Sequence, residues 1–249
     1  MIPLVFVHGF MGGGQQWDAL AASLGKEREI IALDLPGFGA NAGLEPLDRI
    51  EQFAAWVIEQ TLQRGVLRYH LLGHSMGGMI AQEIARRDPT AVERLVLYAT
   101  GPVGDIPGRF ETMAESRHRA QTDGAKATAT RIAATWLRDG EDSHAFPTVA
   151  QIASSAALPA LLAGLTAMEH WSGRSALHHI AAPTLIIWGE HDRSYNWAQI
   201  NELWTTIPGA SLCVLPNSCH LAHLEEPDLF ASVLSRFLSD AQRIEISAR

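Results

Sequence analysis

The sequence is poor in cysteine and in clustered positive charge. Only Cys213 and Cys219 occur among 249 residues, too few for the disulfide framework of a small secreted protein. They do not form a metal-binding pattern, so we expect two free thiols, a reducing compartment and no metal; a local disulfide between the two is the alternative. The formal net charge is −8 and no run of lysine or arginine occurs, which argues against nucleic acid and anionic membranes as partners.

Long hydrophobic runs are missing as well. No segment reaches the ~20 apolar residues that a membrane-spanning helix needs. The apolar start, residues 1–7, carries no basic segment and no small-residue cleavage site, so it predicts a strand rather than a signal peptide. We expect a cytoplasmic protein that acts on a small-molecule substrate and uses no cofactor; its oligomeric state stays open.

Short apolar runs alternate with helical patterns along most of the chain. The runs lack strict apolar–polar alternation, as is typical of strands covered on both faces. Strands are predicted at residues 4–7, 30–33, 69–72, 95–98, 184–188 and 212–215, and helices at 16–24, 48–63, 76–87, 197–206 and 227–239. This order predicts an α/β fold with a doubly wound, mostly parallel sheet.

One interval, residues 101–173, breaks the alternation. It contains no strand pattern, only Ala-rich helical patterns such as 125–137 and 158–170, separated by residues 140–142 and by Phe146-Pro147. Ligands of open α/β sheets bind at the carboxyl edge of the sheet. We therefore predict a core of residues 1–100 and 174–249 with a helical cap, 101–173, over that edge; a helical extension packed elsewhere is the alternative.

The stretch Gly73-His74-Ser75-Met76-Gly77 joins a predicted strand to a predicted helix without a loop. Two glycines at G-x-S-x-G spacing permit such a sharp corner and would leave the Ser75 hydroxyl exposed at a helix N-terminus, where negative charge is favoured. The plain alternative is a turn in which the serine caps the helix.

A serine hydroxyl is a weak nucleophile and needs a base and a group that orients the base. Two later strands end in suitable residues: Asp192 follows the strand at 184–188, and His220 follows the strand at 212–215. The order Ser, Asp, His is the one known for nucleophile-elbow hydrolases. We expect Ser75, Asp192 and His220 to be the catalytic residues.

The glycine-rich loop that begins His8-Gly9-Phe10-Met11 could supply the second half of an oxyanion hole. It follows the first strand, and its backbone can direct an N–H toward the same point as the N–H of Met76. We nominate the amides of Phe10 and Met76. A phosphate-binding loop is disfavoured because Gln15 and Gln16 stand where lysine and serine or threonine are required.

With these motifs the chain resembles the α/β-hydrolase superfamily, which includes esterases, enol-lactonases, meta-cleavage-product hydrolases, cofactor-free haloperoxidases and the menaquinone-pathway synthase MenH. The resemblance spans nearly the whole chain, through residues 8–10, 34–39, 73–78, 183–192 and 220–227. It implies the nucleophile-elbow fold and the Ser, Asp, His triad, but specifies the substrate only weakly.

The resemblance also ranks rival residues. The frame Glu225-Glu226-Pro227 puts His220 at the family's catalytic position, and Asp192 occupies the position of its acid. The remaining candidates receive other roles: His223 packs at a helix start, His191 lies at the pocket edge or surface, Asp34 ties its own turn together, and Glu190 and Asp105 are alternative acids. For the substrate pocket we nominate His8, Gly9, Met11, His74 and Trp197.

Two departures from the family pattern stand out. Family members usually begin with an antiparallel hairpin before the His-Gly strand, and that strand here starts near residue 3, so one edge of the sheet should be truncated. The family usually has glycine before the catalytic histidine, where this chain has Cys219. A residue with a Cβ fits there only at negative φ or with strain.

Three functions follow as hypotheses. The first is a serine hydrolase (carboxylesterase or lactonase) that cleaves small to medium apolar esters or lactones through an acyl-enzyme. The second keeps the triad for carbon–carbon bond hydrolysis or MenH-like elimination; Met79, where MenH-type enzymes tend to have arginine, and His74, where carbon–carbon hydrolases favour asparagine, argue against it. The third is a ligand-binding receptor with a slow triad.

Overall fold

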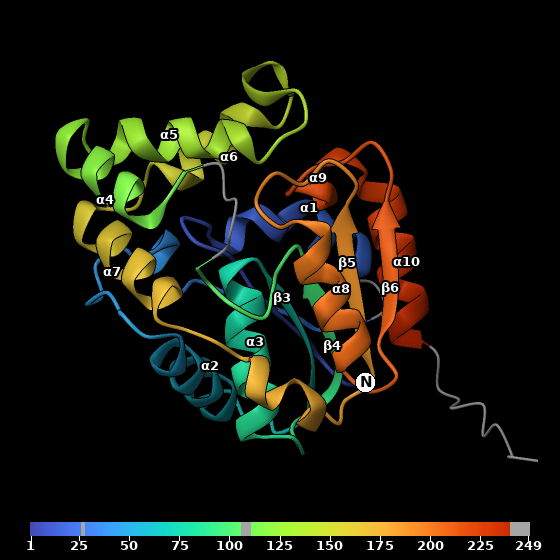
Figure 1. The fold of residues 1–249 in the computed structure, drawn as a ribbon. Helices are drawn as coiled ribbons and strands as arrows, with labels where there is room; N and C mark the ends of the chain where they lie inside the picture. The colour runs from blue at the N-terminus through green and yellow to red at the C-terminus, as the bar shows by residue number, and fades with distance from the viewer. Residues whose placement is uncertain (26–27, 106–110, 240–249) are drawn as a thin grey trace, which may run out of the picture.

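The computed structural model describes residues 1–25, 28–105 and 111–239, and its centre is a six-stranded sheet (Figure 1). The strands are β1 (Leu4–Val7), β2 (Ile30–Leu33), β3 (Tyr69–His74), β4 (Val92–Tyr98), β5 (Thr184–Gly189) and β6 (Ser211–Leu215). They lie in the order β2-β1-β3-β4-β5-β6, and every neighbouring pair is parallel. The predicted doubly wound sheet is confirmed, and in the described residues β2 forms its edge without an antiparallel hairpin.

Each inner strand, β1, β3, β4 and β5, buries side chains on both faces of the sheet, which explains the missing alternation in sequence. In β1, Val5 and Val7 belong to one hydrophobic cluster, and Leu4 and Phe6 belong to the other. The first cluster includes residues of α2 (Ile50–Gln63), α3 (Met76–Arg87) and α8 (Trp197–Thr206). The second includes residues of α1 (Asp18–Leu24) and α10 (Pro227–Ser239). Helices therefore cover both faces.

In the described part of the chain between β4 and β5 there are four α-helices. They are α4 (Met113–Thr122), α5 (Ala125–Thr135), α6 (Phe146–Ala153) and α7 (Leu158–Glu169), and α5 and α6 lie beyond the arrowheads of β5 and β6 in Figure 1. The sequence predicted α5 and α7 but missed α4 and α6. Phe146-Pro147 is not a break, because proline occupies the first turn of α6, where its missing N–H removes no helical bond.

The remaining helices are short: η1 (Gly14–Trp17), η2 (Gly39–Asn41), η3 (Gly140–Asp142), η4 (Arg174–His179) and α9 (Ala222–Glu225).

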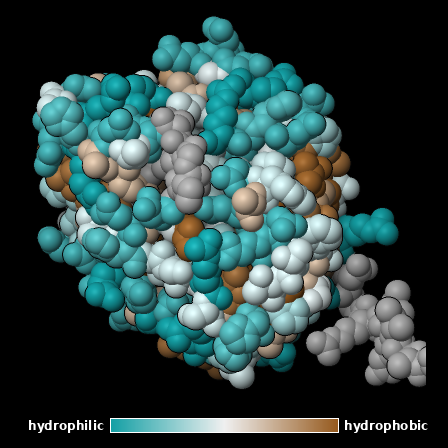
Figure 2. Space-filling view, viewed as in Figure 1, coloured by the Kyte–Doolittle hydropathy of each residue, from teal (hydrophilic) through white to brown (hydrophobic). Residues whose placement is uncertain are grey.

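In the described ranges no single helix is long and apolar enough to cross a membrane; α6 and α7 reach that length only together, across a bend of 94°. Most of the face in Figure 2 is hydrophilic, and a small hydrophobic group lies toward β6 and α10. The exposed Val214 and Leu229 belong to these two elements.

Candidate active site

The nucleophile corner, residues 73–77, connects β3 directly to α3. Ser75 has φ 54° and ψ −119°, a conformation that costs a non-glycine residue backbone strain. A Cβ at Gly73 would overlap the Gly77 carbonyl, and a Cβ at Gly77 would overlap the Val7 carbonyl of β1. The glycines are therefore required by close backbone approach, as predicted. The Ser75 side chain makes no capping hydrogen bond to α3, so the plain helix-cap alternative is not observed.

Hydrogen bonds from the end of β4 and from α3 hold Ser75 in this conformation. Its N–H donates to the Tyr98 carbonyl at 2.9 Å, and its carbonyl accepts from the Thr100 hydroxyl at 2.7 Å and from the Gly78 N–H at 2.8 Å. The residue is largely buried, at 8% exposure. The strained serine is thus fixed through its main chain, which leaves its hydroxyl available.

Asp192 and His220 come together at the ends of β5 and β6. His220 Nδ1 lies 3.0 Å from Asp192 Oδ2, and both side chains are almost fully buried. The other carboxylate oxygen, Oδ1, accepts the N–H groups of Ser194 at 2.7 Å and Tyr195 at 3.3 Å. Because an ionised carboxylate only accepts, His220 Nδ1 carries the hydrogen and Nε2 is left as the basic nitrogen.

The rival residues lie in other contacts. Glu190 Oε2 accepts the Asn217 N–H at 3.4 Å and lies 3.8 Å from His191 Nε2 at the surface. His223 is buried beneath the site, where its Nδ1 is 3.1 Å from the Tyr98 hydroxyl. Asp34 accepts the Gly14 N–H at 2.8 Å, which ties its turn to η1. Asp105 is exposed.

His8 fixes the candidate oxyanion loop. The Leu35 N–H donates to His8 Nε2 at 3.0 Å, so the hydrogen of this imidazole is on Nδ1, which lies 2.7 Å from the Gly9 carbonyl. Burial lowers the pKa of His8 to about 4, so the ring is neutral near pH 7. The Gly12 N–H also donates to the Gly9 carbonyl, at 3.0 Å.

That carbonyl sets the direction of the Phe10 amide, because the two groups share one planar trans peptide. With the Gly9 carbonyl held by two donors, the Phe10 N–H points the opposite way. Among the described residues neither the Phe10 N–H nor the Met76 N–H, the first of α3, has a protein acceptor. Two oriented, unpaired donors beside a serine are what an oxyanion hole requires.

The nominated pocket residues do not all lie together. Gly9, Met11 and His74 line one pocket beside the loop after β1. His8 lies behind that loop, in the contacts given above. Trp197 begins α8 with 48% of the residue exposed, and its ring neighbours Trp188 and Trp204 rather than that pocket wall.

Two aromatic side chains beside His220 were not nominated by the sequence analysis. The Tyr195 ring stacks on the imidazole at 5.8 Å with a 16° interplanar angle, and the Trp136 ring lies 6.0 Å away. Tyr195 follows Asp192 by three residues, which was a usable signal. Trp136 comes from the end of α5, and nothing in the sequence places it against His220.

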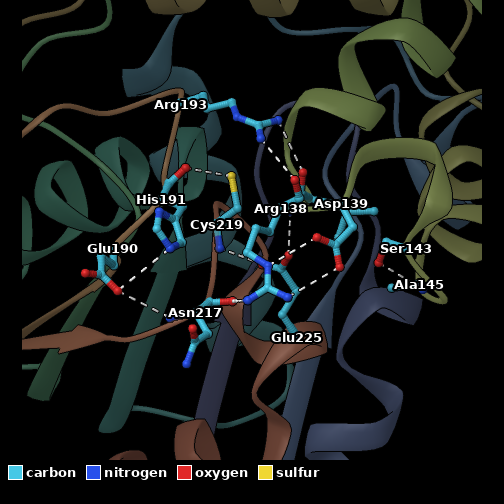
Figure 3. Close-up of polar contacts among 11 residues, drawn as sticks. Arg138, Asp139, Ser143, Ala145, Glu190, His191, Arg193, Asn217, Cys219 and Glu225 are labelled. Carbon is cyan, nitrogen blue, oxygen red and sulfur yellow. Dashed lines mark hydrogen bonds and ion pairs between the residues drawn. The ribbon is translucent and has the colours of Figure 1, made fainter.

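The end of α5 is joined to both loops of the Asp192–His220 pair, and we call this contact the α5 seam: Leu137, Arg138, Arg193, Cys219 and Glu225. The Arg193 guanidinium donates to the carbonyls of Leu137 at 3.4 Å and Arg138 at 3.0 Å (Figure 3). The Glu225 carboxylate accepts two backbone N–H groups, from Arg138 and Cys219, each at 2.6 Å. One carboxylate thus bridges α5 and the residue before His220.

Cys219 fits this position without positive φ, since it is not among the non-glycine residues that have one. Its thiol lies 3.1 Å from the His191 carbonyl and replaces the family's glycine with a further link between the two loops (Figure 3). Burial raises the pKa of the thiol to about 11, which keeps it protonated as a donor. Both cysteines are free.

The described ranges, 1–25, 28–105 and 111–239, contain no group of three or more His, Cys, Asp or Glu side chains placed to hold a metal ion. The candidate groups are the Ser75 hydroxyl, the His220–Asp192 pair and two backbone amides, and His74 Nε2, next to Ser75 in the chain, lies 3.1 Å from the His220 carbonyl. Together they can generate a nucleophile and bind the negative charge that its attack produces.

Comparison with known proteins gives matches over most of the chain. A family model described as "Alpha/beta hydrolase family" matches residues 4–233. A 2-succinyl-6-hydroxy-2,4-cyclohexadiene-1-carboxylate synthase from Enterobacter sp. (strain 638) is 28% identical over 251 residues, which cover 94% of this chain and 91% of the synthase. A pimeloyl-(acyl-carrier protein) methyl ester esterase from Aeromonas hydrophila is 26% identical, with 94% of each chain covered.

A solved structure agrees in fold. The enol-lactonase from Burkholderia xenovorans LB400 superposes with a TM-score of 0.87 over 96% of this chain and 92% of the lactonase, at 22% sequence identity. At that identity the likeness shows the fold alone.

Proposed function

The chain belongs to the alpha/beta hydrolase family, and from that premise we propose that it hydrolyses small to medium apolar carboxylic esters or lactones through Ser75, His220 and Asp192. The observation that carries this proposal is a strained, main-chain-fixed serine whose neighbour His74 lies 3.1 Å, through Nε2, from the carbonyl of His220 in a buried Asp–His pair. Backbone strain of this kind persists where the surrounding structure maintains it for a function.

The reaction would proceed through an acyl-enzyme. His220 Nε2 takes the proton of the Ser75 hydroxyl as Oγ attacks the carbonyl carbon, and Asp192 stabilises the imidazolium from the Nδ1 side. The Phe10 and Met76 amides bind the oxyanion of the tetrahedral intermediate. His220 then protonates the leaving alkoxide, and a water molecule, deprotonated by the same nitrogen, hydrolyses the acyl group from Ser75.

The relatives support both an ester and a non-ester reaction, and one observation favours the ester. Met79 is fully buried in the hydrophobic cluster on α3, so this position offers no cation for an acidic substrate of the MenH-like kind. Carbon–carbon hydrolysis and elimination on the same triad remain the second candidate, supported by the Enterobacter synthase at 28% identity. A receptor with a slow triad is the third.

Ester hydrolysis is tested with p-nitrophenyl esters from acetate to decanoate, with pre-steady-state bursts recorded. Wild type should release about one equivalent of nitrophenol in a burst, and Ser75→Ala should lose the burst and at least about 10³-fold in kcat while its melting temperature stays nearly unchanged. Ser154→Ala, at the end of α6, is the matched control and should keep full activity.

The outcomes separate the three candidates. If Ser75→Ala kept more than about a tenth of the activity, the nucleophile assignment would be wrong. Turnover absent at every chain length would favour carbon–carbon or elimination substrates. A single slow turnover with tight product retention would favour the receptor.

A further inference from the structure

The Ser75 carbonyl and the Met76 N–H belong to one peptide unit. Because that unit is planar and trans, the two groups point in opposite directions, and a group that holds the carbonyl also aims the N–H, the proposed oxyanion donor. The Gly9 carbonyl and the Phe10 N–H are related in the same way, and there the His8 imidazole binds the carbonyl. A side chain that binds the Ser75 carbonyl would have the corresponding role for Met76.

The Thr100 hydroxyl makes this contact with the Ser75 carbonyl. It donates at 2.7 Å, a shorter distance than that of the Gly78 N–H at 2.8 Å or the Met79 N–H at 3.4 Å. The two amides belong to α3, whereas Thr100 follows β4 and is fully buried. The hydroxyl therefore connects the peptide between residues 75 and 76 to a second part of the fold.

Two features of the surrounding backbone bring Thr100 against the first turn of α3. Ala99, the residue before it, has φ 45°, a strained conformation for a residue with a Cβ, and its N–H donates to the Ile187 carbonyl at 2.8 Å. On the other side, a Cβ at Gly78 would overlap the Thr100 side chain. Strain at one residue and a missing side chain at another thus permit the close approach.

We propose that Thr100 is a positioning residue for the Met76 oxyanion donor. Its hydroxyl fixes the plane of the peptide and, because hydrogen bonds in a chain polarise one another, makes the Met76 N–H a stronger donor. The inference rests on the proposed ester hydrolysis. As Ser75 Oγ bonds to the substrate carbonyl carbon and its proton passes to His220 Nε2, negative charge develops on the substrate oxygen, and the aimed N–H binds it.

The variant Thr100→Val removes the hydroxyl and nearly keeps the side-chain shape. Loss of an oxyanion donor itself costs about 10²–10³-fold in kcat, so loss of a group that acts through the donor should cost less. With the p-nitrophenyl esters we expect kcat to fall about tenfold while KM stays within about twofold of wild type, as for a contact that matters only in the transition state. Thr100→Ser, which retains the hydroxyl, should keep most of the wild-type kcat.

A transition-state analogue separates this role from a general loss of structure. Hexyl trifluoromethyl ketone accepts the Ser75 oxygen at its carbonyl carbon and forms an oxyanion that resembles the tetrahedral intermediate. Its inhibition constant should rise in Thr100→Val by the same factor by which kcat falls, because both quantities depend on the same oxyanion contact.

The matched control is Thr61→Val. Thr61 lies in α2, is 1% exposed, and donates its hydroxyl to the Ile58 carbonyl at 2.8 Å, so both substitutions remove a buried bond from a hydroxyl to a carbonyl. The two variants should lose similar amounts of stability in urea. Thr61→Val should nevertheless keep the wild-type kcat and the wild-type inhibition constant.

The amide resonance of Met76 provides a readout that needs no turnover. The chain has six methionines, so protein labelled with nitrogen-15 methionine gives a simple spectrum, in which Met76→Leu identifies the Met76 signal. Thr100→Val should shift this signal because the peptide is less polarised. Thr61→Val should leave it in place.

The outcomes are distinguishable. Wild-type kcat and inhibition constant in Thr100→Val, or a change in KM alone, would overturn the positioning role. If Thr100→Val did not fold, Thr100→Ala beside Thr100→Ser would make the same comparison, because these two side chains differ by the hydroxyl. If wild type neither hydrolysed the esters nor bound the ketone, the proposed function would be contradicted and the role of Thr100 with it, whatever the Met76 resonance showed.

Discussion

The nucleophile corner and the α5 seam hold the two halves of the proposed triad by different means. Around Ser75 the contacts are main-chain hydrogen bonds and glycines packed against carbonyl groups, with neutral histidines below. Around His220 the contacts are made by charged side chains, and Arg138 and Arg193 are exposed. The contacts around the first half cannot accept added volume, whereas those around the second depend on charge, and their two arginines are exposed to solvent.

This difference indicates how each half responds to change. Backbone packing does not relax when a methyl group is added, and it is insensitive to salt. Contacts of exposed guanidinium groups are weakened by water and by counterions. Substitutions and acid can therefore distinguish the two halves.

The largest effect is expected from adding a methyl group at the corner. Gly77→Ala would place a Cβ against the carbonyls of Val7 and His8, which belong to β1 and the loop behind it and cannot move independently. We expect a loss of more than about 3 kcal/mol in the free energy of unfolding, measured in urea. Gly43→Ala is the control, since a Cβ there meets nothing within 4 Å. Equal stability of the two variants would show that the corner can relax.

Acid should weaken the corner next. The folded-state pKa of His8 is lowered to about 4 and that of His74 lies well below 6.5, so below pH 6.5 the unfolded chain binds more protons than the folded one. The contribution of these two histidines to stability should be fully present above pH 6.5 and be lost as pH drops toward 4, by up to about 1.4 kcal/mol per pH unit for each histidine.

Unfolding in urea at pH 7.5, 6.5, 5.5 and 4.5 measures this slope. His8→Asn, which keeps a donor, should be less stable at pH 7.5 yet lose less stability per pH unit. His144→Asn changes an exposed histidine and should leave the slope as in wild type. The assignment to His8 is rejected if all three proteins have the same slope.

The smallest effect is expected at the seam. Glu225→Gln keeps one acceptor but turns an NH₂ group toward a backbone N–H, so one of the two 2.6 Å contacts is lost. We expect a loss of about 1–2 kcal/mol in stability and a severalfold lower kcat, with KM nearly unchanged, because the loop of His220 is less firmly placed. Glu226→Gln removes the same charge one residue on and should have little effect. An unchanged kcat in Glu225→Gln would show that the bridge does not position His220.

The parts of the fold that the sequence predicted are those fixed by local patterns. Both faces of each inner strand are covered, so the runs at residues 4–7 and 69–72 were visible as continuous apolar stretches. The corner at Ser75 was visible because two glycines at G-x-S-x-G spacing permit a sharp turn from strand to helix. Helix α6 was missed because Pro147 was interpreted as a break, although proline in a first turn starts helices.

The seam could not be predicted, because its contacts join residues far apart in sequence. Arg138 bonds to Asn217 and to Glu225, 79 and 87 residues later, and Arg193 reaches back 55 residues to the Arg138 carbonyl. Neither charge spacing nor helical periodicity indicates which carboxylate will meet which amide over such a separation. The same holds for Trp136, which approaches His220 only because α5 ends at this point.

The seam has a consequence for protein engineering. Exchange of the segment from residue 101 to residue 173 with that of a relative looks like a two-junction graft, since the chain leaves the sheet after β4 and returns at β5. The bonds from Arg193 and Glu225 to the end of α5 form a third connection between the segment and the rest of the chain. Arg193 and Glu225 lie outside the exchanged segment, whereas the end of α5 lies inside it. A chimera should therefore also take from the donor the residues that bond to positions 137 and 138. Otherwise the donor segment would face a surface that lacks its hydrogen-bond partners.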